Sequence, residues 1–245
     1  MKAVIKAGTI QKAVGALTAL VTECRMHITE DSMETKAVDS GNCSMVSLKM
    51  PRGAFTEYQG KSLTVGLDLA PLQNFISLAR PDEDLALEFV PKGLHVAFGS
   101  MEYTLLLLDE KTIRKDPAPP TFESPVVVKL KGGDLLQAVK GLGKMGAVKV
   151  QIKADQKGKS FRLGSPGNTD TVKVSLQPVD GVQGTGKCWY TYDLISEIAR
   201  TIGEAEEVQV SFGTDLPITF TLEVAGCPVT YILAPMVDVE EGDVV

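Results

Sequence analysis

Chemically reactive side chains are scarce in this sequence. It holds only two histidines, His27 and His95, and they fall in strand-like segments far apart in the chain. The cysteines form no C-x-x-C pair, which predicts reduced, buried thiols and not disulfides or a zinc site. They are Cys24, Cys43, Cys188 and Cys227. We therefore expect no metal, no cofactor and no enzymatic activity.

Long apolar runs and a surplus of basic residues are also missing. No stretch approaches the ~18 apolar residues that cross a bilayer, and residues 1–6 lack the apolar core of a signal peptide. We expect a cytoplasmic protein without membrane contact. The net charge of −6 argues against binding nucleic acid over the whole surface, although it does not exclude a local basic patch.

One glycine motif has the form of a phosphate-binding loop, G-x-G-x-x-G at residues 141–146. A phosphate loop needs these glycines at the start of a helix. Here they fall at the end of a predicted helix, where glycine is a common stop signal. An enzyme that uses the glycine-rich loop 178–186 or His95 remains the alternative from another functional class.

Hydrophobic periodicity predicts an α+β protein with antiparallel strands. The 3.6-residue period of amphipathic helices occurs at residues 7–21, 70–80, 133–145 and 193–203. The intervening segments alternate like strands and are separated by turn residues. One of these predicted strands, residues 101–109, contains four consecutive leucines and is apolar on both faces. The acidic tail, residues 236–245, is expected to be mobile.

The two halves of the chain are a duplication. Residues 5–17 read I-K-x-G-x-I-x-x-A-V-x-x-L, and residues 130–142 read L-K-x-G-x-L-x-x-A-V-x-x-L, at an offset of 125. Asp68-Leu69 and Asp193-Leu194 share this offset at the second helix of each half. Such repetition predicts two copies of one domain. We expect domains at residues 1–110 and 126–235.

Between the halves lies a proline-rich connector, residues 111–125. Its prolines favour an extended backbone and exclude a helix or a central strand. Phe122 is a candidate for pinning the connector to the sheets. Ile113 could do the same or end the preceding strand.

The expected helices are the basic part of an acidic chain. Over residues 8–21, 68–80, 131–145 and 193–203 they hold six cations and four anions, so the rest of the chain carries −8. Ordinary polar helix faces would explain this equally well. If all four helices lined one surface, they would form a weak, sequence-indifferent track for phosphates.

The whole chain resembles the archaeal and eukaryotic DNA sliding clamp family, that of proliferating cell nuclear antigen. The resemblance rests on the duplicated halves, the connector, Asp193-Leu194, and the ending Tyr231-Ile232-Leu233-Ala234-Pro235 before an acidic tail. It implies a homotrimeric ring with helices inside, a processivity factor that encircles duplex DNA in the nucleoid. The DNA-facing cations would be Lys6, Lys12, Arg80, Lys131, Lys140, Lys144 and Arg200.

The same resemblance implies where subunits join and where partners dock. Subunits would pair through residues 103–109 and 171–177, with Tyr103, Leu105 and Leu107 facing Thr171, Lys173 and Ser175. A central core strand would explain the four leucines of the first segment nearly as well. DNA polymerase, clamp loader, flap nuclease and DNA ligase would insert short peptides (PIP boxes) into a pocket beneath the connector. Its residues would be Val38, Cys43, Met45, Pro119, Pro120, Phe122, Pro217, Ile232, Ala234 and Pro235. The sparse helix charge motivates an alternative, a specialised or hetero-oligomeric clamp subunit.

Overall fold

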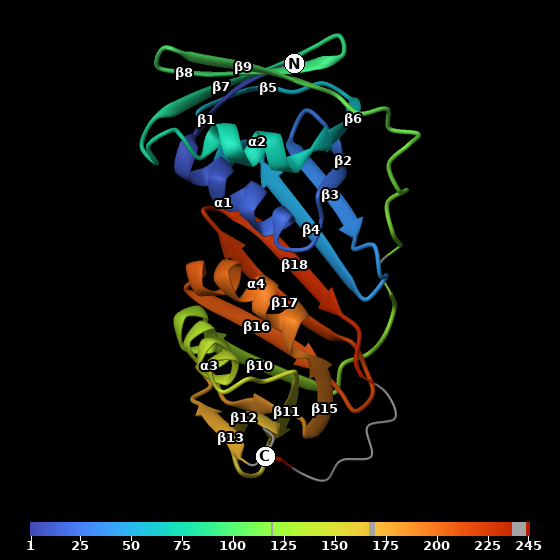
Figure 1. Ribbon diagram of the computed structural model, residues 1–245, viewed down its shortest axis with the longest axis vertical. Coiled ribbons are helices and arrows are strands. Elements are labelled where there is room, and N and C mark those ends of the chain that lie inside the picture. The colour runs from blue at the N-terminus through green and yellow to red at the C-terminus, as the bar shows by residue number, and fades with distance from the viewer. Residues whose placement is uncertain (119, 167–169, 237–243) are drawn as a thin grey trace. The chain divides into compact units, whose positions relative to one another are not determined.

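The computed structural model describes residues 1–118, 120–166, 170–236 and 244–245 (Figure 1). Contacts divide the chain into a first unit, residues 1–118 with 224–229, and a second unit, residues 119–223 with 230–245. The division falls inside the connector. No helix in the described ranges is long and apolar enough to cross a membrane.

The first unit contains two antiparallel sheets and the helices α1 and α2. One sheet has the strand order β5-β1-β7-β8-β9, and in a second, longer sheet the strands of this unit follow the order β4-β3-β2-β6. In chain order the elements are β1 (Lys2–Lys6), α1 (Ala7–Thr18), β2 (Glu23–Ile28), β3 (Ser32–Val38), β4 (Ser44–Pro51), a 3-10 turn (Arg52–Ala54), β5 (Glu57–Gln59), β6 (Leu63–Asp68), α2 (Leu69–Ile76), β7 (Asp84–Val90), β8 (Gly93–Phe98) and β9 (Met101–Leu106).

The second unit repeats this plan. Its strands follow one another in the orders β14-β10-β16-β17-β18 and β13-β12-β11-β15, which match the first unit strand for strand. The elements are β10 (Val126–Lys131), α3 (Gly132–Lys144), β11 (Lys149–Asp155), β12 (Ser160–Pro166), β13 (Thr171–Leu176), β14 (Val182–Gln183), β15 (Gly186–Thr191), α4 (Tyr192–Glu204), β16 (Glu207–Phe212), β17 (Ile218–Val224) and β18 (Cys227–Leu233). The repeated order confirms the fold expected from the duplication.

Equivalent hydrogen bonds begin the first helix of each unit. Ala7 donates its N–H to the Glu83 carbonyl at 2.9 Å, and Gly132, 125 residues later, donates to the Glu206 carbonyl at 3.1 Å. Each helix then buries an apolar stripe against the sheets, because its small and aliphatic residues recur with the helical period. The stripe of α1 contains Ile10, Val14 and Leu17, and that of α3 contains Leu135, Val139 and Leu142.

The paired helices of each unit also touch one another. Gln11 of α1 donates from its amide to the carbonyls of Ile76 and Ala79, at 2.8 and 2.9 Å, and so ties α1 to the end of α2. In the second unit the Tyr192 hydroxyl donates to the Val139 carbonyl at 3.2 Å. These contacts join the two helices of each unit.

Several sequence expectations were wrong in detail. Helix α1 ends at Thr18 and not at residue 21, and the loop 178–186 contains the short strand β14, which pairs with β10. The four-leucine strand ends at Leu106. Leu107 then donates to the Lys92 carbonyl, and Leu108 bridges to Gly66 of β6. These leucines face different neighbours, so the segment is not a strand buried on both faces.

The glycine motif of residues 141–146 is a helix stop, as predicted. Gly141 and Gly143 lie within α3, and Gly146 adopts a positive φ of 76° just beyond its end. Ala147 then donates back to the Leu142 carbonyl at 3.2 Å. This is the usual way in which glycine closes a helix and satisfies its last carbonyls.

Candidate binding surfaces

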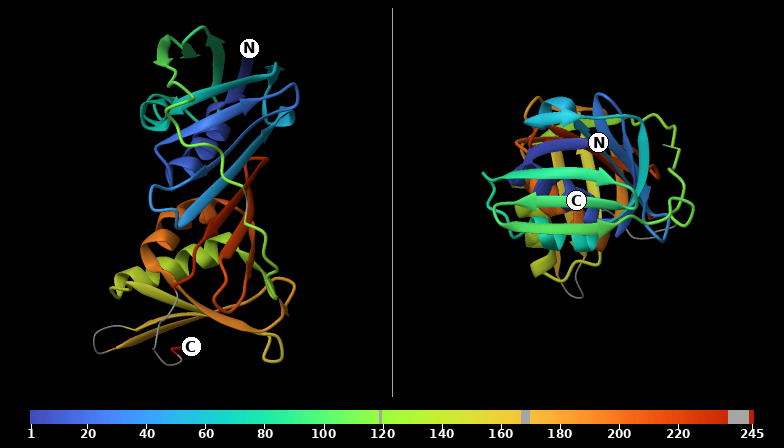
Figure 2. Two further views of the ribbon diagram at one scale, coloured as in Figure 1. Left: turned by 90° about the vertical axis from the view of Figure 1, so that its right-hand side faces the viewer. Right: turned by 90° about the horizontal axis from the view of Figure 1, so that it is seen from above.

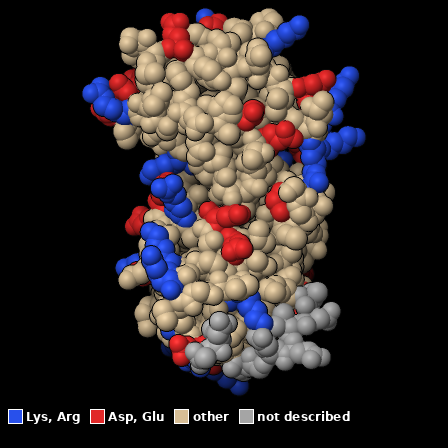
Figure 3. Space-filling view, viewed as in Figure 1, with Lys and Arg blue, Asp and Glu red and all other residues tan. Residues whose placement is uncertain are grey.

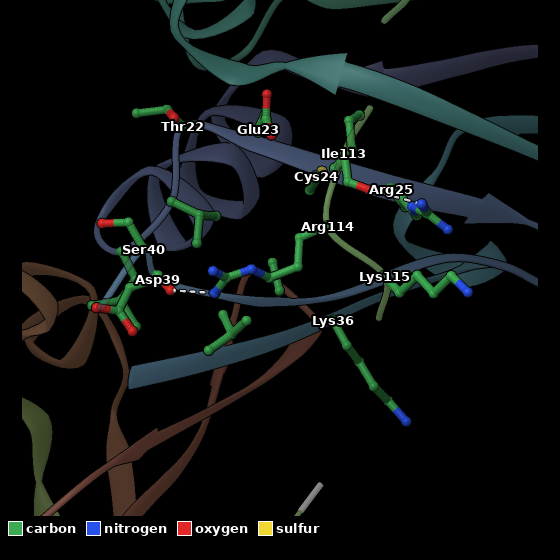
Figure 4. A pocket seen from close by; sticks show the side chains of 14 residues that line it. Thr22, Glu23, Cys24, Arg25, Lys36, Asp39, Ser40, Ile113, Arg114 and Lys115 are labelled. Atoms are coloured by element: carbon green, nitrogen blue, oxygen red, sulfur yellow. Dashed lines mark hydrogen bonds between the residues drawn. The ribbon is translucent and has the colours of Figure 1, made fainter. Parts of the chain in front are cut away.

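The first part of the connector covers a cavity of about 240 Å³ in the first unit. We call it the connector cavity. Its walls come from the chain entering β2, the end of β3 with the following loop, and connector residues 113–115 (Figure 4). The lining is Leu20, Val21, Thr22, Glu23, Cys24, Arg25, Lys36, Ala37, Val38, Asp39, Ser40, Ile113, Arg114 and Lys115.

Ile113 fixes the connector at this cavity. Its side chain is 5% exposed, and a Cβ placed on Gly66 would lie 2.5 Å from its Cδ1 atom. The missing side chain of Gly66 therefore makes the space that Ile113 fills. Of the two roles open for Ile113, pinning is the one seen, whereas Phe122 is only half-buried.

Polar contacts hold the neighbouring connector residues. Arg25 donates to the Ile113 carbonyl at 2.7 Å, and Arg114 donates to the Asp39 carbonyl at 2.9 Å, as the dashed lines in Figure 4 show. Arg114 also reaches the Asn42 side chain at 2.8 Å. The His27 ring contacts the Asp116 carboxylate. Sequence reasoning missed these anchors, although charged residues beside a buried Ile113 were a signal.

Three of the predicted peptide-binding residues lie close together in the first unit. Val38 and Met45 are directly opposite in the β3–β4 pair, so their side chains share one face of the sheet. Cys43 lies in the loop between them and is exposed, which corrects the expectation of a wholly buried cysteine set. Asp39 shapes this loop by accepting from the N–H groups of Gly41 and Ser44.

The other predicted peptide-binding residues lie in the second unit. Ile232 alternates along β18 with the fully buried Tyr231 and Leu233, and it is half-exposed. Pro217, Ala234 and Pro235 are also partly exposed, Phe122 is half-buried and Pro120 is exposed. Pro119 lies outside the described residues.

Strand β15 is hydrogen-bonded to two of the segments that contain these residues, one beside Pro217 and one beside Pro235. The Tyr190 hydroxyl donates to the Leu216 carbonyl at 2.9 Å, beside Pro217. The Trp189 carbonyl accepts from the Met236 N–H at 2.8 Å, beside Pro235. Burial raises the pKa of the Tyr190 phenol well above its usual range, so this hydroxyl stays a donor. The single tryptophan of the sequence was the signal that could have drawn attention to β15.

The predicted DNA-facing cations fall into two groups. Lys6 pairs with Asp84 at 2.8 Å, and Arg80 pairs with Glu83 at 3.2 Å, so both already face a carboxylate. The others are exposed, and none has an ion pair with another described residue. They are Lys12, Lys131, Lys140, Lys144 and Arg200. On the face drawn in Figure 3, the described Lys, Arg, Asp and Glu atoms are interspersed.

With Lys140 and Lys144, α3 contains more cations than any other helix of the described residues. These two lysines are four residues apart and therefore lie on the same side of the helix, which is the exposed side. Lys144 also lies in the last turn, where a cation interacts favourably with the helix dipole. Two of the five unpaired cations predicted to face DNA therefore lie on this one helix of the second unit.

The predicted subunit contacts fall on strands at sheet edges. Strand β9, with Tyr103 and Leu105, ends one sheet of the first unit, and β13, with Thr171, Lys173 and Ser175, ends one sheet of the second. Tyr103 stacks on Phe75 of α2 at 5.1 Å and Leu105 is buried. Leu107 lies beyond the end of β9. The three β13 residues are exposed.

The residues considered for catalysis are dispersed. His95 contacts the Thr104 hydroxyl on the neighbouring strand, and His27 belongs to a different sheet. In the loop 178–186, Asp180 pairs with Lys129 at 3.2 Å. Among the described residues no group of three or more His, Cys, Asp or Glu side chains could hold a metal ion.

Comparison with known families and curated proteins gives consistent matches. The family model for the proliferating cell nuclear antigen N-terminal domain matches residues 1–98. The chain is 33% identical to a DNA polymerase sliding clamp of Methanosphaerula palustris, covering 98% of this chain and 100% of that protein. It is 34% identical to the corresponding protein of Methanothrix thermoacetophila at the same coverage.

Comparison with solved structures gives matches of the same kind. A structure described as the C-terminal region of FEN-1 bound to A. fulgidus PCNA matches with a TM-score of 0.91 and 25% identity, over 98% of this chain and 99% of that one. PCNA from Thermococcus kodakaraensis shares the fold, with a TM-score of 0.85 and 22% identity over 96% and 99%. The chain therefore belongs to the family of DNA polymerase sliding clamps, the family of proliferating cell nuclear antigen.

Proposed function

We propose that three copies of this chain form a closed ring around duplex DNA and act there as a processivity factor without catalysis of their own. The observation that carries this proposal is the repeated unit. Both units have the same strand orders, and β9 of the first unit and β13 of the second, which hold different places in the repeated order, each lie unpaired at a sheet edge. A chain with complementary open edges can pair head to tail with its copies, and rotation can close the series.

Exposed apolar side chains near these edges support the assembly. In the first unit Leu106 of β9 is 74% exposed and Leu78, after α2, is 60% exposed. In the second unit Met145 and Val148, after α3, are 56% and 76% exposed. Burial of such side chains between subunits would remove them from water. The edge strands would add backbone hydrogen bonds beside them.

DNA would be held topologically and only weakly by charge. The exposed cations of the helices can reach phosphates but carry no sequence information. A ring prevents escape without tight contacts, so sliding stays fast, and the working place is the nucleoid.

Partners would be tethered through short peptides at the surfaces that carry Val38 and Met45 in one unit and Ile232 and Ala234 in the other. The relative from A. fulgidus has the C-terminal region of FEN-1 bound. By the same mode we expect DNA polymerase, flap nuclease, DNA ligase and the clamp loader to bind. Tethering raises the concentration of each enzyme at the template.

The deciding experiment compares primed circular DNA with the same DNA linearised. With polymerase and clamp loader present, the chain should lengthen products on the circle and lose most of this effect on linear DNA with free ends. Equal stimulation on both substrates would exclude a topological link. Light scattering should give a trimer.

The sparse charge of the helices favours a second candidate, a hetero-oligomeric clamp subunit, because Lys6 and Arg80 are already paired. In that case the purified chain would remain monomeric and trimerise only with related subunits. A stable trimer of this chain alone would rule it out.

A further inference from the structure

A glutamine on the outer side of a sheet in the second unit is unexpectedly buried. Along β11 the side chains of Val150, Ile152 and Ala154 face the core. Gln151 and Lys153 alternate with them and so face the opposite side. Gln151 is nevertheless only 1% exposed, so another part of the chain must cover it.

The cover is the segment Val244-Val245. The Gln151 side-chain oxygen accepts from the N–H groups of both residues, at 2.9 and 3.1 Å. Lys153 donates to the Val245 main-chain oxygen at 2.9 Å. The left view of Figure 2 places this end of the chain beneath the sheet, on the side away from α3. The expectation of a mobile tail is therefore wrong for these two residues.

A missing side chain provides the space for the two valines. Gly164 of β12 is directly opposite Gln151. A Cβ atom at Gly164 would lie 2.2 Å from the Val245 Cγ1 atom and 3.0 Å from the Val244 Cγ1 atom. Even alanine would therefore collide with the segment. Val245 is 6% exposed in this position.

The tryptophan forms the other side of the site. Trp189 of β15 is opposite Gln151 on the flank away from Gly164, so its side chain is on the same face of the sheet. It is 7% exposed, and the Lys149 ammonium lies 5.2 Å from its ring centre. Met236 donates to its carbonyl. A buried polar side chain, an open glycine and an aromatic ring thus lie in one row across three strands.

We propose that Gln151, Lys153, Gly164 and Trp189 form a binding site for an extended peptide with two adjacent β-branched aliphatic residues, and that the chain's own Val244-Val245 occupies it in cis. We call it the tail site. Gln151 and Lys153 hydrogen-bond to the backbone of the peptide, and the space above Gly164 accommodates its two aliphatic side chains. This docking needs neither DNA nor ring closure, because every contact lies within the second unit.

Hydrogen exchange tests the cis contact. In the wild-type chain the Val244 and Val245 amides should be protected. Gly164→Ala should speed their exchange at least about tenfold. Gly133→Ala is the matched control, because a Cβ there meets nothing within 4 Å. Unprotected amides in the wild type, or protection unchanged by Gly164→Ala, would overturn the proposal. Protection that falls on dilution would also overturn it, since the occupant would then come from a second copy.

Binding in trans tests the site itself. A chain truncated after Pro235 should bind a synthetic peptide of residues 236–245, detected through the emission of Trp189, the only tryptophan. The same peptide with both C-terminal valines changed to Asp should not bind. The full chain should not respond either, because its site is filled. If truncation harms folding, the Val244→Asp/Val245→Asp full-length variant should show the red-shifted Trp189 emission of an open site. Emission unchanged in that variant would count against the proposal.

Discussion

At the scale of single residues, burial changes the pKa of the Cys24 thiol. Burial raises its pKa to about 12, against roughly 8.5 for a free thiol. Burial likewise raises the pKa of the Tyr58 phenol to about 12. Both groups are therefore neutral in the folded chain at any physiological pH, and both lose their proton at a lower pH in the unfolded chain than in the folded one.

The free energy of unfolding should consequently fall as pH rises above about 9. The unfolded chain loses the Cys24 proton first, while the folded chain keeps it until about pH 12, so alkali favours unfolding. Denaturant unfolding at pH 8 and pH 10 measures the effect. Cys24→Ala should show a smaller loss between the two values. An equal loss in the variant would mean that other groups cause it.

Ile232 and Ala234 offer a residue-level test of partner binding. Because Ile232 is half-exposed between two buried neighbours on β18, Ile232→Asp with Ala234→Asp should leave the core intact. It should weaken binding of a labelled flap-nuclease C-terminal peptide by tenfold or more, since apolar contact is replaced by a charge that must be desolvated. Fluorescence polarisation measures this. Val179→Asp, at an exposed loop position, should bind like the wild type, and undiminished affinity in the double variant would remove both residues from the site.

At the scale of elements, α3 is the helix on which we expect DNA contact to depend most. Lys140→Glu with Lys144→Glu reverses two exposed cations without touching its buried stripe. Polymerase stimulation on primed circular DNA should drop several-fold, and the loss should deepen with falling salt, because charge repulsion is less screened. Lys157→Glu with Lys159→Glu, exposed in the β11–β12 turn, is the control. Stimulation untouched in the α3 variant would show that DNA does not pass along this helix.

Periodicity and the 125-residue offset were enough to predict the helices, the antiparallel strands and their repetition. Short edge elements were out of reach: β5 and β14 span three and two residues, too few for a period to register. The end of β9 at Leu106 could not be predicted either. Four consecutive leucines give the same hydrophobic pattern whether all of them belong to one strand or the last two leave it. Long-range contacts such as Gly66 with Ile113, or Gly164 with Val245, leave no local pattern at all.

For the whole molecule, a substitution of the exposed Leu106 can test subunit assembly without disturbing the folding of the single chain. Leu106→Lys should change the free energy of unfolding of the single chain by no more than about 0.5 kcal/mol, because the side chain is already in water. It should nevertheless shift the protein from trimer towards monomer in size-exclusion chromatography with light scattering. Val179→Lys, which changes an exposed valine in a loop, is the control and should remain trimeric. A Leu106→Lys trimer as stable as the wild type would place the subunit contact elsewhere.

The duplication has a consequence for symmetry. The backbone repeats every 125 residues, but the cations do not: Lys140 and Lys144 stand where the first half has Gly15 and Ala19, and Arg200 stands where it has Phe75. In the proposed ring, six arches of nearly one shape would therefore carry their cations in two different arrangements that alternate from arch to arch. The electrostatic field in the hole would have threefold and not sixfold periodicity. A duplex passing through it would meet the lysine pair of α3 on three walls and the single Lys12 of α1 on the other three, so its phosphates would find paired cations at every second wall.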